Sequence, residues 1–304
     1  MDLIWSKADF SAEFKKYIGF VDSDIPFIRM ESALRASTSE ITDLIGLPQY
    51  EIVKAAPVDP ETTFPKLVKY AILLRALIIY TPTADIAFTA RGRKTRNDEH
   101  DGTPWQWMLD ANIQALDNLY YRHLDLLLKH MFTNSIPVNV KKYDHKELFV
   151  SSLDMFERHF NINGSYYLYL KLLPALQECE DLELLPRIGP LPLNQFSPAM
   201  KNIAEKCCVF YALDWGMRRL NIQLFPEGVL QTSLGTVNGS VGKNYKPSDK
   251  LQYLETAMTF KNDCQKYLGA LEGMIRKATN VKQLYPNQVV LDSGIYGDDG
   301  FIDT

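Results

Sequence analysis

A glycine-rich loop, five histidines and four cysteines are the parts of this 304-residue chain whose residue types could carry chemistry. The loop runs from Gly235 to Asn244 and contains the Gly-Lys pair of a phosphate-binding loop at Gly242. That motif needs a glycine where Val237 stands and a magnesium-binding hydroxyl where Asn244 stands. We therefore interpret the segment as a flexible loop and predict no nucleotide site there.

The histidines and cysteines lack the spacing of a metal site. His123 and His130 are seven residues apart, whereas two histidine ligands on one helix face stand four apart. Cys207 and Cys208 are adjacent, and no C-x-x-C pair occurs. We interpret the cysteines as small buried hydrophobic residues. The sequence therefore predicts no catalytic residue, no cofactor and no metal, and a protein that is not an enzyme.

The strongest local charge is a run of four cations in six residues, made up of Arg91, Arg93, Lys94 and Arg96. Such side chains neutralise phosphates without reading a base sequence. The whole chain, however, has 33 basic and 37 acidic residues and a net charge of −4, so it has no overall positive field to attract nucleic acid. We regard DNA contact as possible but not favoured. Contact with a neighbouring protein and a solvated loop without a partner are the alternatives.

The C-terminal segment 291–304 is rich in glycine and aspartate and also contains Tyr296, Phe301 and Ile302. A short sequence of this composition is typical of a flexible tail or of a tail that docks onto a neighbour. These three apolar residues and the four cations of the basic run are the candidate partner contacts.

Helical periodicity dominates the rest of the chain and predicts an all-α fold. Long helices are expected from Pro65, after Pro104, from Pro198 and from Ser248. Shorter amphipathic helices are expected over 10–17, 26–44, 146–160 and 166–177. The apolar stretch 70–80 is too short to span a membrane and contains Arg75, so it predicts a core helix. The segment 136–140 reads as a linker.

The chain divides into an N-terminal helical half, 1–140, a C-terminal helical half, 141–290, and the tail. The two halves match at an offset of 142, which becomes 143 near residue 41 and 146 in the last long helix. This repetition predicts an internal duplication, although two amphipathic helical sequences can also match by chance. The matched pairs include Phe14 and Phe156, Met30 and Leu172, Ala33 and Ala175, Leu34 and Leu176, Ile41 and Leu184, Ile45 and Ile188, Asp117 and Asp263, and Tyr121 and Tyr267.

The N-terminus has an acidic residue, Asp2, and no apolar stretch of the length that a secretory signal needs. We expect a cytoplasmic protein with no membrane contact.

Four motifs together resemble a known group of proteins. They are Thr42 to Gly46 (TDLIG), Ala84 to Gly92 (ADIAFTARG), Trp105, and Tyr121 to Asp125 (YRHLD). The chain resembles an uncharacterised family from prophages and mobile elements of gut bacteria, which is similar to phage head–tail connector (adaptor) proteins. The resemblance covers roughly residues 10 to 280, although this chain is about twice the size of a usual connector adaptor.

The resemblance implies a non-enzymatic virion assembly protein. Helical bundles would form its body, and loops and the tail would contact neighbouring subunits, in a ring of copies or with other virion proteins. Two alternatives remain. One is a small-molecule-binding protein or enzyme of unknown reaction, with a site between the two halves lined by tyrosines and phenylalanines. The other is a cytoplasmic helical interaction module.

Overall fold

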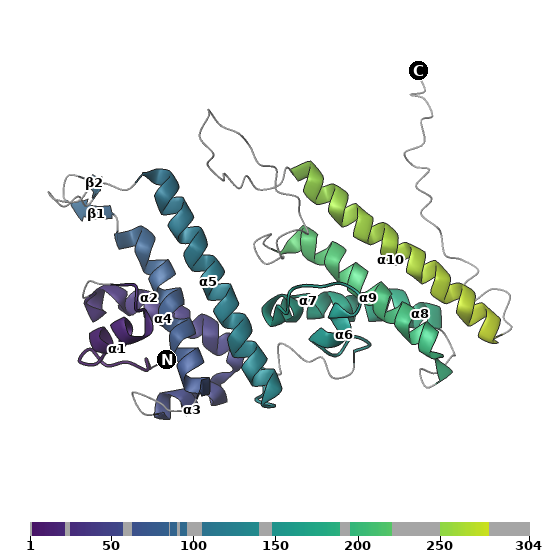
Figure 1. Ribbon diagram of the computed structural model, residues 1–304, viewed down its shortest axis with the longest axis horizontal. Coiled ribbons are helices and arrows are strands. Elements are labelled where there is room, and N and C mark those ends of the chain that lie inside the picture. The colour runs from purple at the N-terminus through teal and green to yellow at the C-terminus, as the bar shows by residue number, and fades with distance from the viewer. Residues whose placement is uncertain are drawn as a thin grey trace, which may run out of the picture.

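The computed structural model describes residues 2–21, 25–56, 63–84, 86–89, 92–95, 105–139, 148–188, 195–220 and 250–279. Among these residues, two groups of helices follow each other along the chain (Figure 1). The N-terminal group contains α1 (Phe10–Tyr17), α2 (Phe27–Ile45), α3 (Leu47–Ala55), α4 (Thr63–Ala84) and α5 (Gln106–Thr133). The C-terminal group contains α6 (Leu153–Glu157), α7 (Tyr166–Cys179), η1 (Glu180–Leu184), α8 (Leu185–Ile188), α9 (Pro198–Arg219) and α10 (Lys250–Thr279). The predicted all-α class is confirmed.

Helix α4 is the centre of the N-terminal group. It is apolar around most of its circumference and packs against α1, α2, α3 and α5. Ile78 is its last buried residue, and the helix continues through Pro82 to Ala84. By length and composition alone α4 is apolar enough to cross a membrane, but contacts with four other helices are what a core helix makes.

Helix α9 has the same place in the C-terminal group, where it packs against α6, α7 and α10. Ser197 caps its first turn by accepting a hydrogen bond from the Met200 amide at 3.2 Å, and Pro198 occupies the first helical position. Ser152 and Ser165 cap α6 and α7 in the same way. These caps explain why the three helices begin where they do.

One continuous helix runs from Tyr166 to Ile188 and comprises α7, η1 and α8, of which η1 is not α-helical. Residues Glu180–Leu184 form a π-helical turn, which accommodates one residue more than an α-helical turn would. Glu180 is buried in this turn, and its carboxylate accepts a hydrogen bond from the Phe149 amide at 2.6 Å. Burial raises the pKa of Glu180 to about 7.

Between α2 and α3 the chain turns at Gly46, whose φ of 89° is unfavourable for a residue with a Cβ atom. Asn139, in the segment that follows α5, covers this turn. Its backbone amide donates to the Leu44 carbonyl at 3.2 Å, and its side-chain amide donates to the Asp43 carbonyl at 3.0 Å. The carbonyl groups at the end of α2 thus accept hydrogen bonds from a residue almost 100 positions later in the chain. These hydrogen bonds hold the segment after α5 against an early helix of the same group.

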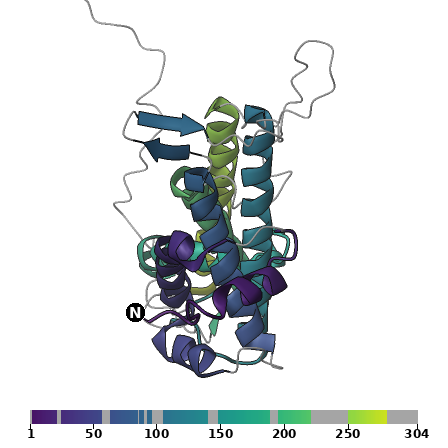
Figure 2. The same cartoon turned by 90° about the vertical axis from the view of Figure 1, so that its left-hand side faces the viewer.

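A short antiparallel hairpin replaces part of the loop that the sequence predicted around the basic run. Strands β1 (Ile86–Thr89) and β2 (Gly92–Thr95) pair from Ile86 with Thr95 to Thr89 with Gly92. β-Branched and aromatic residues favour the strand conformation here, and this register leaves a two-residue connection, the shortest common hairpin length. The hairpin lies near the start of α5 (Figures 1 and 2), whereas α10 starts farther across the molecule, on the other side of α5 (Figure 1).

Other differences from the expected elements are small. Helix α1 has the predicted bounds, whereas α6 covers only five residues of the helix expected over 146–160. After α6 the Glu157 carboxylate accepts the amides of Ile162 and Gly164, which turns the chain toward α7. Helix α3 was not predicted. The expected division near residue 140 falls next to residues 140–147, which lie outside the described residues.

A buried ion pair fixes α1 against α4. Lys69 Nζ lies 3.9 Å from Glu13 Oε2, and both side chains are almost fully buried. The indole N–H of Trp5 also donates to the Glu13 carboxylate. A buried carboxylate that loses its cation is costly, because neither water nor another charge replaces the lost interaction.

Replacing Lys69 with Met should therefore lower the free energy of unfolding by about 3 kcal/mol, as measured by urea denaturation. The matched control is Lys54→Met, which breaks the exposed pair with Asp2 and should change stability little. Adding Glu13→Gln to Lys69→Met should recover part of the loss, because no unpaired charge then remains. Equal losses in the two lysine variants would contradict this account.

Candidate functional site

The two helical groups meet where α5 contacts α7. Asp125 on α5 lies at the N-terminus of α7, where its Oδ1 atom accepts hydrogen bonds from the Tyr167 amide at 2.9 Å and the Ser165 hydroxyl at 3.2 Å. The free amides at a helix N-terminus favour a carboxylate. Burial acts in the opposite direction and is the larger effect, since it raises the pKa of Asp125 to about 6.

Aromatic side chains cover both sides of this contact. The rings of Tyr121 and Tyr167 stack with their centroids 5.8 Å apart, and those of Phe132 and Tyr166 stack at 5.1 Å. The ammonium group of Lys171 lies 5.2 Å from the centre of the Tyr167 ring, within cation–π range. The contact between the groups therefore combines one buried hydrogen-bonded carboxylate with stacked rings.

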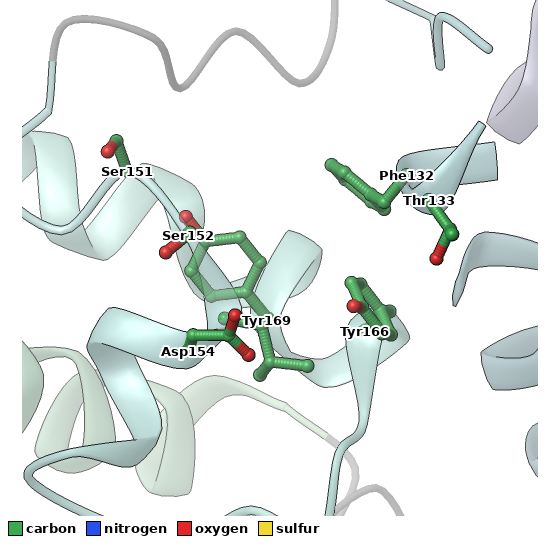
Figure 3. Close-up of a pocket in the computed structure, with 8 residues that line it drawn as sticks. Phe132, Thr133, Ser151, Ser152, Asp154, Tyr166 and Tyr169 are labelled. Carbon is green, nitrogen blue, oxygen red and sulfur yellow. The ribbon is translucent and has the colours of Figure 1, made fainter. Parts of the chain in front are cut away.

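A cavity of about 340 Å³ lies beside this contact, between the end of α5 and the starts of α6 and α7 (Figure 3). Two of its hydroxyl groups already have roles in the fold. The Ser152 hydroxyl caps α6, and the Tyr169 hydroxyl donates to the Val150 carbonyl at 3.0 Å. The volume is near the lower limit for a small-molecule site. The cavity is lined by Phe132, Thr133, Ser151, Ser152, Leu153, Asp154, Tyr166 and Tyr169.

A second cavity, of about 200 Å³, opens between α2, α5 and α7. Glu40 on its wall binds Arg75 of α4, with Arg75 Nε 2.7 Å from the carboxylate, and the Arg75 guanidinium lies 5.4 Å from the centre of the Tyr120 ring. Lys171, also on its wall, has its ammonium group over the Tyr167 ring. This cavity is smaller than an ordinary ligand site.

The described histidines pack as structural residues. His123 lies 3.8 Å from the Tyr70 ring centre, and burial lowers its pKa to about 4, so its imidazole is neutral near pH 7. His130 stacks on Phe64, and His159 Nε2 lies 2.9 Å from Glu205. His100 and His145 lie outside the described residues. Among the residues that the structure covers, no group of three or more His, Cys, Asp or Glu side chains is arranged to hold a metal ion.

The four cysteines converge in the core of the C-terminal group, from α7, α9 and α10. All are buried and free. The Cys264 thiol donates a hydrogen bond to the Cys207 carbonyl oxygen at 3.6 Å. Interaction with the Cys208 thiol, together with burial, raises the pKa of Cys179, and burial also raises those of Cys207 and Cys208. A thiol that stays protonated is a poor nucleophile and a poor metal ligand.

The structure describes only part of the predicted contact set. Arg93 and Lys94 lie on β2, whereas Arg91, Arg96, Tyr296, Phe301 and Ile302 lie outside the described residues.

One exposed apolar surface was missed from the sequence. Trp105, Trp107 and Met108, at the start of α5, are 72%, 64% and 44% exposed. We call these three residues the Trp patch. The signal available in the sequence was two tryptophans within three residues, next to a proline and ahead of the apolar stripe of α5, which begins at Leu109.

No known protein family, curated protein or solved structure matches the chain.

The position of Asp125 between α5 and the N-terminus of α7 makes the stability of the protein depend on pH. Because the pKa of Asp125 is raised in the folded state from 3.8 to about 6, the folded chain binds a proton more tightly than the unfolded chain does. The contribution of Asp125 to stability therefore falls as the pH rises from about 4 to about 6.

Replacing Asp125 with Asn keeps the hydrogen-bond acceptor and removes the ionisation. Relative to the natural protein, the Asp125→Asn variant should gain about 3 kcal/mol between pH 4 and pH 7 in urea denaturation. Asp125→Ala, which loses both hydrogen bonds, should be destabilised at low pH as well. Parallel pH profiles for the Asn variant and the natural protein would show that Asp125 ionises normally.

Proposed function

We propose that the protein is a non-enzymatic assembly protein that acts through protein–protein contacts, similar to a phage head–tail connector. The observation that carries the proposal is the Trp patch at the start of α5. Tryptophan is among the residues most enriched at the energetic centres of protein interfaces, and Trp105 and Trp107 are both more than half exposed. In this proposal the partners are copies of the chain in a ring, or other virion proteins, and the protein is cytoplasmic until it joins the virion.

The position of the Trp patch supports a contact surface larger than three residues. The hairpin that carries Arg93 and Lys94 lies at the same end of the molecule (Figures 1 and 2). Protein interfaces combine an apolar centre with a polar rim. Contact with DNA through the hairpin is not favoured.

We also propose that the two groups of helices arose by duplication of one unit. In both groups a short helix and a longer one pack against a central helix of 22 residues, which packs in turn against a long final helix. Thus α1, α2, α4 and α5 correspond to α6, α7–η1–α8, α9 and α10. Residues at matching positions are buried in both groups, as with Met30 and Leu172, Leu34 and Leu176, and Ile41 and Leu184.

The π-helical turn accounts for the change in offset between the two groups. The offset is 142 up to Leu34 and Leu176 and becomes 143 at Ile41 and Leu184. The additional residue thus falls between 177 and 184, the interval that contains η1. A π-turn is the form in which a helix accommodates a one-residue insertion without rotating its later residues away from the core.

A small-molecule-binding function is the second candidate, because the 340 Å³ cavity lies where the two groups meet (Figure 3). Its aromatic walls and hydroxyl groups suit a small polar molecule. Native mass spectrometry of the protein as purified tests this function, since a bound molecule would add a defined mass.

The Trp patch should be required for assembly. Light scattering coupled to size-exclusion chromatography should detect species larger than the 34.8 kDa chain as its concentration rises. Trp105→Ala combined with Trp107→Ala should weaken this association by about tenfold or more, the loss typical of an interface hot spot. The matched control is Ile28→Ala on α2, which removes an equally exposed apolar side chain (73%) from another part of the surface. A chain that stays monomeric at all concentrations would refute self-assembly.

The duplication makes a separate prediction about chain length. Deleting Asp181, an exposed residue of η1, should convert the π-turn into regular α-helix and leave the chain folded. Deleting Ser39, an exposed residue at a comparable position in α2, should be far more damaging, because it rotates every later residue of that regular helix by about 100°. Thermal unfolding followed by circular dichroism compares the two variants. Equal destabilisation would contradict an insertion at η1.

A further inference from the structure

The 340 Å³ cavity between the end of α5 and the starts of α6 and α7 has a single charged side chain on its wall. That side chain is Asp154, in the first turn of α6. Within the part of the chain that the structure describes, no lysine, arginine or histidine forms an ion pair with its carboxylate. A carboxylate on the wall of a cavity attracts a ligand of positive charge.

Two further features make this cavity electrically negative. Burial raises the pKa of Tyr166, and the nearby carboxylates of Asp154 and Glu157 raise it further. Helix α5 ends at Thr133 on the cavity wall, and the C-terminal end of this 28-residue helix carries partial negative charge. The positive end of α7 is already compensated, since its first amides donate to Asp125 and to its own capping serine.

Two hydroxyl groups of the lining residues have already donated their protons. The Ser151 hydroxyl donates to Met155 Sδ at 3.5 Å, and the Tyr169 hydroxyl donates to the Val150 carbonyl at 3.0 Å. A hydroxyl has one proton and two lone pairs, so these two oxygens can still accept a hydrogen bond. A carboxylate accepts as well. The wall therefore suits a ligand that donates hydrogen bonds.

Aromatic rings form the other side of the cavity. Figure 3 shows Ser152 and Asp154 across the cavity from Phe132 and Tyr166, whose rings stack at 5.1 Å. An aromatic ring attracts a cation that lies within about 6 Å of its centre, and it also packs against apolar groups. A ligand in this space would meet a carboxylate on one side and aromatic rings on the other.

We propose that this cavity binds a small molecule with a protonated primary amine. The ammonium group donates to Asp154, and the apolar part of the ligand lies against Phe132 and Tyr166. This inference deepens the second candidate function, ligand binding, on which it rests, and it is independent of assembly through the Trp patch. The volume of about 340 Å³ limits the ligand to a molecule of less than drug size.

Four probes of similar shape test the chemical class. Benzylamine is a protonated primary amine at neutral pH, benzyl alcohol is neutral, benzoate is an anion, and benzyltrimethylammonium is a cation without N–H donors. Each probe is titrated with the full-length protein at neutral pH and low salt, and binding is followed by saturation-transfer NMR of the probe. Benzylamine should bind at least about tenfold more tightly than the other three, because only it combines positive charge with N–H donors.

Substitutions at the wall assign the binding to this cavity. Asp154→Asn keeps the shape of the side chain and removes its charge, so benzylamine should lose about tenfold in affinity whereas benzyl alcohol should change little. The matched control is Asp181→Asn, which removes an exposed carboxylate of η1 outside the cavity and should leave binding unchanged. Tyr166→Leu should also weaken benzylamine binding, whereas Tyr166→Phe, which keeps the ring, should bind it as the natural protein does. Circular dichroism verifies that each variant is folded.

The outcomes for the ligand class and for ligand binding itself are distinguishable. Failure of benzylamine to bind, an equal affinity for benzyl alcohol or benzyltrimethylammonium, or unchanged binding in Asp154→Asn would overturn the amine assignment. A co-purified molecule without an amine, found in this cavity by native mass spectrometry and lost in Tyr166→Leu, would support ligand binding and overturn its proposed class. Absence of both benzylamine binding and a co-purified molecule would refute both.

Discussion

Each group of helices depends on one central helix that must be covered on nearly every side. In α4 the buried positions follow one another from Ala71 to Leu74, so no face is left for solvent at that level. Burial of apolar side chains therefore requires neighbours all around, and α1, α2, α3 and α5 provide them. Helix α9 imposes the same requirement on α6, α7 and α10. Each central helix thus requires apolar faces on several other helices of its group to cover its buried side chains.

Several buried or half-buried polar groups lie where one helix contacts another. Glu13 and Lys69 fix α1 on α4, and Glu178 accepts hydrogen bonds from Tyr211 and Trp215 to fix α7 on α9. Asp125 does the same between the two groups. Apolar packing is not directional, whereas a hydrogen bond between named atoms selects one arrangement. These polar contacts thus determine how each pair of helices is oriented, and burial of the apolar core stabilises that orientation.

The sequence predicted those features that come from local periodicity and capping. The bounds of α1, the starts of α7 and α9 and the central position of α4 were all readable, because apolar spacing and residues such as Ser197 and Pro198 act locally. The hairpin was missed because two four-residue strands carry little periodic signal. The convergence of Asp125 with Ser165, and of Cys179 with Cys208 and Cys264, depends on helix packing that spacing along the chain does not encode. The exposure of Trp107 was missed for the same reason, since an aromatic residue at a helix start is equally compatible with the core.

The buried cysteines have a consequence for the chemical durability of the chain. Oxidants and alkylating agents react with thiolates that they can reach, and the thiols of α7, α9 and α10 are buried, with the pKa of each one raised. While α10 stays packed on α9, these thiols are protonated and shielded from dissolved oxidants, so we expect the folded chain to form cross-links or sulfenic acids only slowly. The thiols should therefore stay reduced for as long as the chain stays folded.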